Sequence, residues 1–138
     1  MIVLDDRYGY DFELEKLENI KTSLTSKEVE LIFMSDDDIA GINAEFRDKN
    51  SPTDVLSFPL EEMPNSPLGT IIISIDKVKQ VAHEFQHGED DELALLFIHG
   101  LLHLLGYDHE YDEGEMREKE KHLIEEFRLP NSLILRND

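Results

Sequence analysis

The residues best suited to chemistry are three histidines in the second half of the chain. They lie in an apolar run, residues 93–109. His99 and His103 are four residues apart, so on an α-helix they project from the same face about one turn apart. Gly106 offers the positive φ that commonly ends a helix, and His109 follows three residues later, where it can swing back toward the pair. This spacing is what a three-histidine zinc site needs, one zinc per chain, with a fourth position open for water.

Several imidazoles in a leucine-rich segment need an explanation, because burying polar groups costs free energy unless they find partners. A single histidine on an apolar helix is more often an ordinary core residue than a ligand. Three at this spacing favour a metal, which supplies the missing partner. Three neutral imidazoles leave the ion its full charge, and water bound to such a zinc has a pKa of about 7. The predicted chemistry is hydrolysis by metal-activated water.

The chain carries a second histidine pair, His83-Glu-Phe-Gln-His87, which matches the His-Glu-x-x-His pattern of zinc metalloproteases. The helical phase argues against this match. In a helix over 76–87 the apolar residues, Val78 and Phe85 among them, form one stripe, and both histidines lie on the opposite face, toward water. We interpret this pair as part of a solvated helix face.

Length and composition are those of one globular domain. The 138 residues predict a single domain over 1–138, with 40% hydrophobic and 33% charged residues, as in ordinary soluble proteins. The absence of cysteine excludes disulfides, thiolate metal sites and a cysteine nucleophile. The N-terminus has no signal-peptide pattern, and no apolar run reaches the length of a membrane span. We therefore expect a cytoplasmic protein with no membrane contact.

The formal net charge of −19 bears on the class of partner. Nonspecific nucleic-acid binders usually present a basic surface, because phosphate contacts supply most of their affinity. The field of this chain should repel RNA and DNA, and composition alone argues against a nuclease. A role on nucleic acid would need a local positive cleft, a bound cation or a partner that delivers the substrate.

The elements that position the histidines are strands interleaved with helices early in the chain, while helices dominate later. Apolar alternation and β-branched runs predict four strands, at about 2–4, 28–34, 55–58 and 70–75. Helical periodicity predicts five helices, at about 11–24, 36–46, 76–87, up to 105, and 112–127. We expect the last two strands to pair in an antiparallel way across a loop that contains proline and glycine.

Helix starts are expected at capping residues: Ser35 or Asp36 for the second helix and Asp76 for the third. Together these elements favour an α+β fold with a small mixed sheet of four strands packed with about five helices. The metal site would lie on a helix in the C-terminal half and on the turn that follows it.

The histidine segment, His99-Gly-Leu-Leu-His103-Leu-Leu-Gly-Tyr-Asp-His109, resembles the signature of the YbeY family of bacterial metal-dependent endoribonucleases. The resemblance covers about residues 30–127. It includes the following further matches in family order: Asn43-Ala-Glu-Phe-Arg47, Pro52-Thr-Asp-Val-Leu-Ser-Phe-Pro59, Leu68-Gly69 and Met116. One departure is Thr70, because many members carry an aspartate after that glycine.

The resemblance implies that His99, His103 and His109 are the zinc ligands and that Arg47 is a functional arginine in the cleft. It implies a zincin-like fold, with the metal helix against a mixed sheet. It also implies single-strand-specific RNA cleavage, maturation of the 3′ end of 16S ribosomal RNA, and a part in ribosome quality control. The expected partners are single-stranded and ribosomal RNA.

Within that reading, Arg47 can clamp the phosphoryl oxygens through two parallel hydrogen bonds. Gly100 cannot act as a base, whereas Asp108 could orient a ligand histidine or simply belong to the turn. Ser57 and Thr53 could hold phosphate or a ligand histidine, although such residues more often just end strands.

Two alternatives stay open. The ligand spacing also resembles the metzincin peptidases, although Gly100 stands where those enzymes carry their general-base glutamate. A non-catalytic, metal-stabilised adaptor is the second alternative, since the charge of −19 suits basic ribosomal proteins or other ribosome-associated factors. Such a role could coexist with catalysis.

Overall fold

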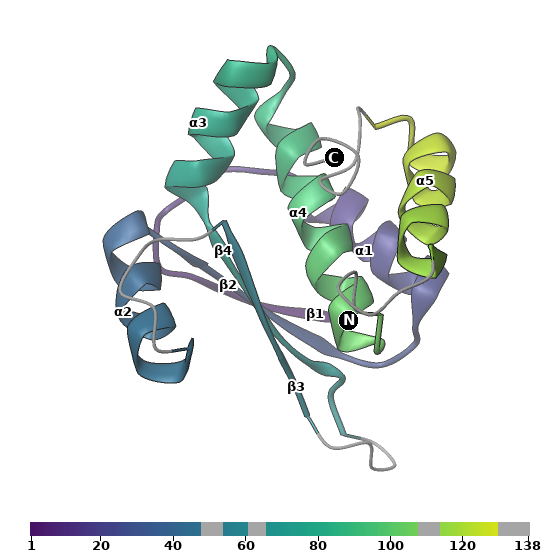
Figure 1. Ribbon diagram of the computed structural model, residues 1–138, viewed down its shortest axis with the longest axis horizontal. Coiled ribbons are helices and arrows are strands. Elements are labelled where there is room, and N and C mark those ends of the chain that lie inside the picture. Colours follow the sequence, from purple (N-terminus) through teal and green to yellow (C-terminus); the bar gives the residue numbers. More distant parts are fainter. Residues whose placement is uncertain (48–53, 61–65, 108–113, 130–138) are drawn as a thin grey trace.

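The computed structural model describes residues 1–47, 54–60, 66–107 and 114–129 of the chain. These residues form four strands and five helices (Figure 1). In chain order they are β1 (Ile2–Asp6), α1 (Leu14–Leu24), β2 (Val29–Met34), α2 (Asp36–Arg47), β3 (Val55–Pro59), β4 (Gly69–Ser74), α3 (Ile75–Phe85), α4 (Glu89–Leu104) and α5 (Glu115–Phe127). The predicted order of elements is confirmed, with boundaries that differ by a few residues.

The four strands form one mixed sheet in the order β1-β2-β4-β3. β1 and β4 both run parallel to β2, whereas β3 runs antiparallel to β4. The antiparallel pairing predicted for the last two strands is confirmed, and its register pairs Val55 with Ile73 and Ser57 with Ile71. β3 is therefore an edge strand of the sheet.

The larger core lies between one face of the sheet and helices α1, α3, α4 and α5. α4 is its centre: eleven of its sixteen residues are buried, including an unbroken run from Glu92 to Ile98. A helix that is apolar on nearly all sides must be covered on nearly all sides, and α4 contacts β3, β4, α1, α3 and α5. His99 and His103 interrupt this burial, because both are partly exposed.

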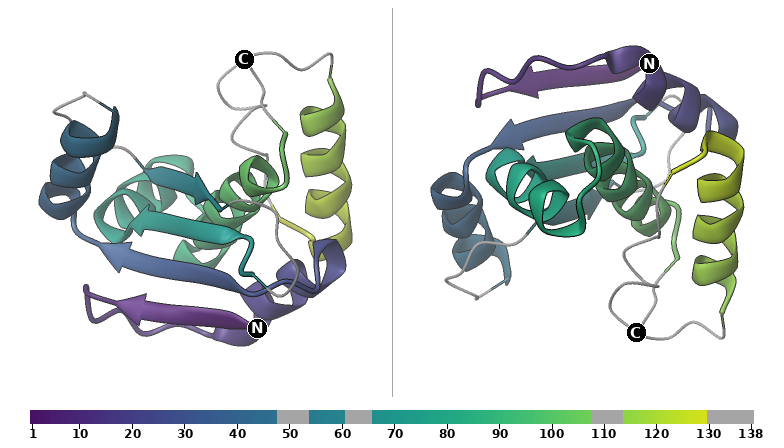
Figure 2. Two further views of the ribbon diagram at one scale, coloured as in Figure 1. Left: turned by 90° about the horizontal axis from the view of Figure 1, so that it is seen from below. Right: turned by 90° about the horizontal axis from the view of Figure 1, so that it is seen from above.

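The other face of the sheet is covered by α2 alone among the described helices, and Figure 2 shows α2 and α5 on opposite sides of the molecule. A smaller cluster packs there, in which Ile39 of α2 meets Ile32, Met34, Leu56 and Ile72 of the strands. Within the described ranges, no helix combines the length and apolarity needed to cross a bilayer.

Helix starts follow the capping prediction in one case and depart from it in the other. The hydroxyl oxygen of Ser35 accepts a hydrogen bond from the backbone N–H of Asp38, as expected for the start of α2. At α3, however, the cap is Ser74, whose Oγ accepts from the N–H of Lys77. The prediction of Asp76 as the cap is wrong. Asp76 lies inside the first turn, and its carboxylate is used by other elements.

The carboxylate of Asp76 accepts hydrogen bonds from the backbone N–H of Asp36 at 2.8 Å and from the hydroxyl of Tyr8 at 2.7 Å. These two hydrogen bonds lower the pKa of Asp76 below its ordinary 3.8, and the bond from the N–H of Asp36 has the larger effect. The hydrogen bonds to the Asp76 carboxylate therefore stabilise the fold fully at pH values above the pKa that Asp76 has in the unfolded chain. This stabilisation is lost as the pH falls through the lower pKa of Asp76 in the folded protein.

Asp76→Asn is accordingly expected to lower the free energy of unfolding by about 1–2 kcal/mol at pH 7. The deficit should shrink as the pH falls below 3.8 and then through the lower native pKa, because the wild-type carboxylate itself gains a proton over that range. Urea denaturation at pH 7 and at successively lower pH values measures it. The exposed Asp37, as Asp37→Asn, is the control and should change little; a deficit at Asp76 that does not depend on pH would contradict the assignment.

Candidate metal centre

The position of α4 over the sheet depends on close contact at Gly100. A Cβ atom at this glycine would lie 2.9 Å from Cγ2 of Ile71, 3.1 Å from Oγ of Ser57 and 3.2 Å from Cγ2 of Val55. The hydroxyl of Ser57 donates a hydrogen bond to the carbonyl oxygen of Gly100 at 3.1 Å. Ser57 therefore ties the edge strand β3 to α4. Gly100 faces the sheet, and the face of α4 that carries the histidines turns elsewhere.

The two histidines predicted to share one helix face do so, and their rings converge. Nε2 of His99 and Nε2 of His103 are 3.1 Å apart, and the ring planes are inclined at 79°. Zinc binds imidazole nitrogen at about 2.0–2.1 Å, so two nitrogens of a tetrahedral site lie about 3.3 Å apart. The observed separation fits two ligands of one ion.

The turn after α4 holds His103 in the form that can bind a metal. Gly106 has φ 102°, and the N–H groups of Gly106 and Tyr107 bond back to the carbonyls of His103 and Leu102. This is the glycine-terminated helix end that the sequence predicted. It brings the carbonyl oxygen of Tyr107 to 2.9 Å from Nδ1 of His103. A carbonyl only accepts, so Nδ1 carries the proton and Nε2 keeps its lone pair.

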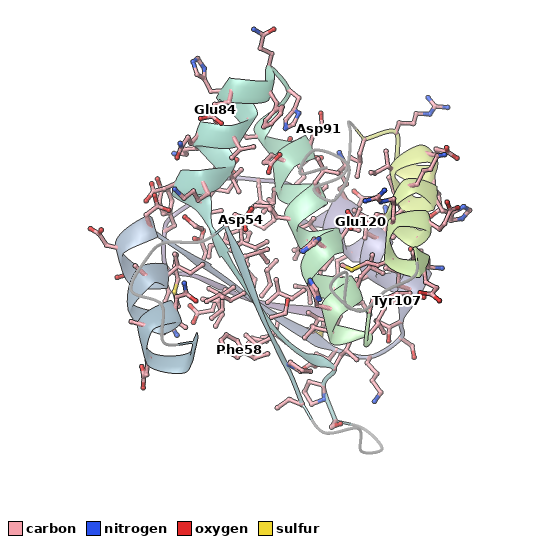
Figure 3. The ribbon with its side chains drawn as sticks, viewed as in Figure 1. Asp54, Phe58, Glu84, Asp91, Tyr107 and Glu120 are labelled. Carbon is pink, nitrogen blue, oxygen red and sulfur yellow. The ribbon has the colours of Figure 1, made fainter. Side chains whose placement is uncertain are left out.

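His99 meets a different kind of group on its other nitrogen. Oε2 of Glu120, on α5, lies 3.5 Å from Nδ1 of His99, and the side chains are 1% and 12% exposed, respectively. Figure 3 labels Glu120 on α5 and Tyr107 beyond the end of α4. Glu120 was not among the site residues predicted from the sequence, although a signal for it was present. Glu120 falls in one helical stripe with the buried Met116 and Leu123, so a carboxylate occupies a core position.

The remaining predicted site residues fall at or beyond the edges of the described ranges. His109 lies outside them, as do Asp108 and Thr53. Arg47 is the last residue of α2, and only its backbone is described. The described residues alone contain no group of three or more potential ligand side chains that could hold a metal. The roles of Arg47 and His109 therefore stay predictions.

The second histidine pair is placed partly as predicted. His83 is exposed on α3, but α3 ends at Phe85 and Gln86 adopts a left-handed conformation with φ 55°. His87 therefore does not lie on the helix. Its Nε2 contacts the fully buried Glu92 at 2.9 Å, so the prediction that His87 points to water is wrong. Phe85, predicted to be core, is 52% exposed. The pair does not converge.

Comparison with known proteins points to one family. The family model described as Endoribonuclease YbeY matches residues 10–128 of the chain. A protein named Endoribonuclease YbeY from Nautilia profundicola is 56% identical over 138 residues, covering all of this chain and 99% of the relative. Another of that name from Campylobacter jejuni is 52% identical over 137 residues, covering 99% of this chain and 97% of the relative.

The fold has a relative among solved structures. A solution structure of a Thermotoga maritima protein is similar with a TM-score of 0.62 and 35% sequence identity, and the match covers 92% of this chain and 89% of that one. The region that the family model matches, residues 10–128, contains both converging histidines, Gly106 at the end of α4, and Glu120. The chain belongs to the YbeY endoribonuclease family.

Proposed function

We propose that this chain is an endoribonuclease that hydrolyses phosphodiester bonds of single-stranded RNA, with one zinc ion held by His99, His103 and His109. Membership of the YbeY endoribonuclease family supports the reaction class. The observation that supports the metal is the approach of the two Nε2 atoms to 3.1 Å. Tyr107 supports it further, because its carbonyl keeps the proton of His103 on Nδ1.

When bound, zinc would lower the pKa of a water molecule and attract electron density from a phosphoryl oxygen. The residues of the chain do the rest. His99 and His103 would both present Nε2 to the ion from a largely buried helix, so the two ligands are already close together before the metal binds. Arg47 is proposed to bind the phosphoryl oxygens and to stabilise the charge that develops on them in the transition state.

Packing at Gly100 favours this reading over a metallopeptidase. A metzincin-like peptidase needs a glutamate there as general base. The Cβ of any residue at position 100 would already lie 2.9 Å from Ile71, which is fully buried. The proposal retains a zincin-like arrangement, with the metal helix against a mixed sheet, and assigns the glycine to helix–sheet contact.

The proposed cellular role follows the family resemblance: maturation of the 3′ end of 16S ribosomal RNA and ribosome quality control, in the cytoplasm. The net charge of −19 suits contact with basic ribosomal proteins or other ribosome-associated factors, which could bring the RNA to the site. Delivery of the RNA by a basic partner would overcome the charge repulsion between this acidic protein and its polyanionic substrate.

Arg47→Ala is expected to lower kcat on single-stranded RNA about 100-fold, because one charged contact to the phosphoryl oxygens is lost, while zinc content stays at one per chain. The assay compares labelled single-stranded RNA, duplex RNA and casein. Arg7→Ala is the control, since Arg7 is exposed just after the end of β1 and pairs with Asp5. Cleavage of casein but not RNA would support the peptidase, and cleavage of neither would support the adaptor. Full RNA cleavage by Arg47→Ala would contradict the role of the arginine.

A further inference from the structure

We infer that Glu120 is a positioning residue for the zinc site: its carboxylate accepts the Nδ1 proton of His99 and so holds Nε2 of that ring toward the ion. The inference rests on the proposed function. It adds a residue from α5 to a site otherwise built from α4 and the turn after it.

The burial of Glu120 is the first observation. Its side chain is 1% exposed, between the buried Met116 and Leu123 on the same face of α5. A carboxylate is almost never fully buried unless it is paired, because the loss of hydration is costly. Among the described atoms none makes a hydrogen bond with its Oε2. Nδ1 of His99 lies 3.5 Å from this oxygen.

The second observation is that Nδ1 of each histidine faces an oxygen acceptor. Nδ1 of His103 is held by the carbonyl oxygen of Tyr107 at 2.9 Å, and Nδ1 of His99 faces Glu120. Histidines that bind metals almost always donate their other N–H to a carboxylate or a backbone carbonyl. The two rings here have one partner of each kind. A separation of 3.5 Å is long for a hydrogen bond, and catalytic hydrogen bonds often tighten only when the site is occupied.

The chemical consequence concerns the tautomer of His99. Neutral imidazole carries one proton, and only a nitrogen without that proton can bind zinc. An anion beside Nδ1 stabilises the proton there, which frees Nε2. It also makes the ring a better electron donor to the metal. Without Glu120, the Nε2–H form would become accessible to His99.

A second buried glutamate, Glu92, also pairs with a histidine and offers a comparison. Glu92 contacts Nε2 of His87 at 2.9 Å and is fully buried, and it joins the start of α4 to the residues after α3. The His99–Glu120 pair differs because the opposite nitrogen of His99 meets a second imidazole. A structural role for Glu120 would affect folding alone, whereas a positioning role would affect zinc affinity in the folded protein.

The test measures zinc affinity by competition with a chromophoric chelator, and the unfolding midpoint of the metal-free protein. Glu120→Leu is expected to weaken zinc binding about 10- to 100-fold. Its metal-free midpoint should equal or exceed that of wild type, because an apolar side chain of similar size replaces a buried charge. Glu120→Gln should bind zinc with intermediate affinity, because its amide oxygen can still accept the Nδ1 proton. Glu118→Gln, exposed on the same helix, should bind zinc like wild type.

NMR of the zinc-loaded protein supplies a readout other than affinity. In wild type the Nδ1–H proton of His99 should resonate downfield, because a carboxylate accepts it, and in Glu120→Leu the resonance should move upfield. The same resonance position in both proteins would overturn the inference, as would wild-type zinc affinity in both Glu120 variants. Failure of the proposed function would look different, because the wild-type protein itself would then bind no zinc.

Discussion

His103→Ala is expected to abolish stoichiometric zinc binding and, with it, cleavage of single-stranded RNA. The loss of activity should exceed the roughly 100- to 1,000-fold typical of removing one transition-state hydrogen bond, because the ion itself would leave. The substitution removes the Nε2 atom that lies 3.1 Å from Nε2 of His99. Zinc content by elemental analysis and cleavage of a labelled RNA measure the two effects.

The fold should survive this substitution, because His103 is partly exposed and alanine is the best helix former. A circular dichroism spectrum that matches wild type therefore belongs to the experiment. His83→Ala is the matched control: this histidine is exposed on α3 and does not converge with another. It should retain full zinc content and activity. If His103→Ala keeps its zinc, or if His83→Ala loses it, the assignment of the site is wrong.

Gly69→Ala is expected to lower the free energy of unfolding by at least about 2 kcal/mol. A Cβ at this position would lie 2.5 Å from the carbonyl oxygen of Phe58, 2.9 Å from Cα of Pro59 and 2.8 Å from Cδ2 of Leu104. Two of these atoms belong to the backbone of β3, so no side-chain rotation can relieve the overlap. Urea denaturation measures the loss.

The same substitution at Gly41 should have the opposite sign. Gly41 is exposed within α2, and nothing lies within 4 Å of the position a Cβ would take. Gly41→Ala should therefore raise the free energy of unfolding by about 0.5–1 kcal/mol, through helix propensity. Equal changes in the free energy of unfolding for Gly69→Ala and Gly41→Ala would contradict the view that close packing between β3, β4 and α4 requires a glycine at position 69.

The features predicted well from the sequence depend on short stretches of chain. The convergence of His99 and His103 follows from four-residue spacing on one helix, and the end of α4 follows from Gly106. The pairing of β3 with β4 also follows from neighbouring segments, because adjacent strands joined by one loop usually pair. The four strands and five helices were predictable for the same reason: apolar periodicity is visible within each window.

The wrong predictions concern residues whose environment is set by contacts with other elements and not by the local sequence. The periodicity of the 76–87 segment placed Phe85 inside and His87 outside, and the structure reverses both. Gln86, in a left-handed conformation, ends α3 early. His87 then contacts the buried Glu92 of α4, a residue that the periodicity of the 76–87 segment does not include. The sequence position of Asp76 predicts a helix cap, but in the fold its carboxylate accepts hydrogen bonds from the N–H of Asp36 and the hydroxyl of Tyr8.

The sequence by itself determined the convergent histidine pair, the turn after it and the family, because spacing along one helix and a motif of adjacent residues are properties of a single segment. Only the tertiary structure decided that Gly100 is a contact point with the sheet and that Glu120 stands behind His99. Both roles depend on which elements pack against α4. A glycine and a glutamate look the same in a sequence whether they face water or a neighbour, and only packing tells the two apart.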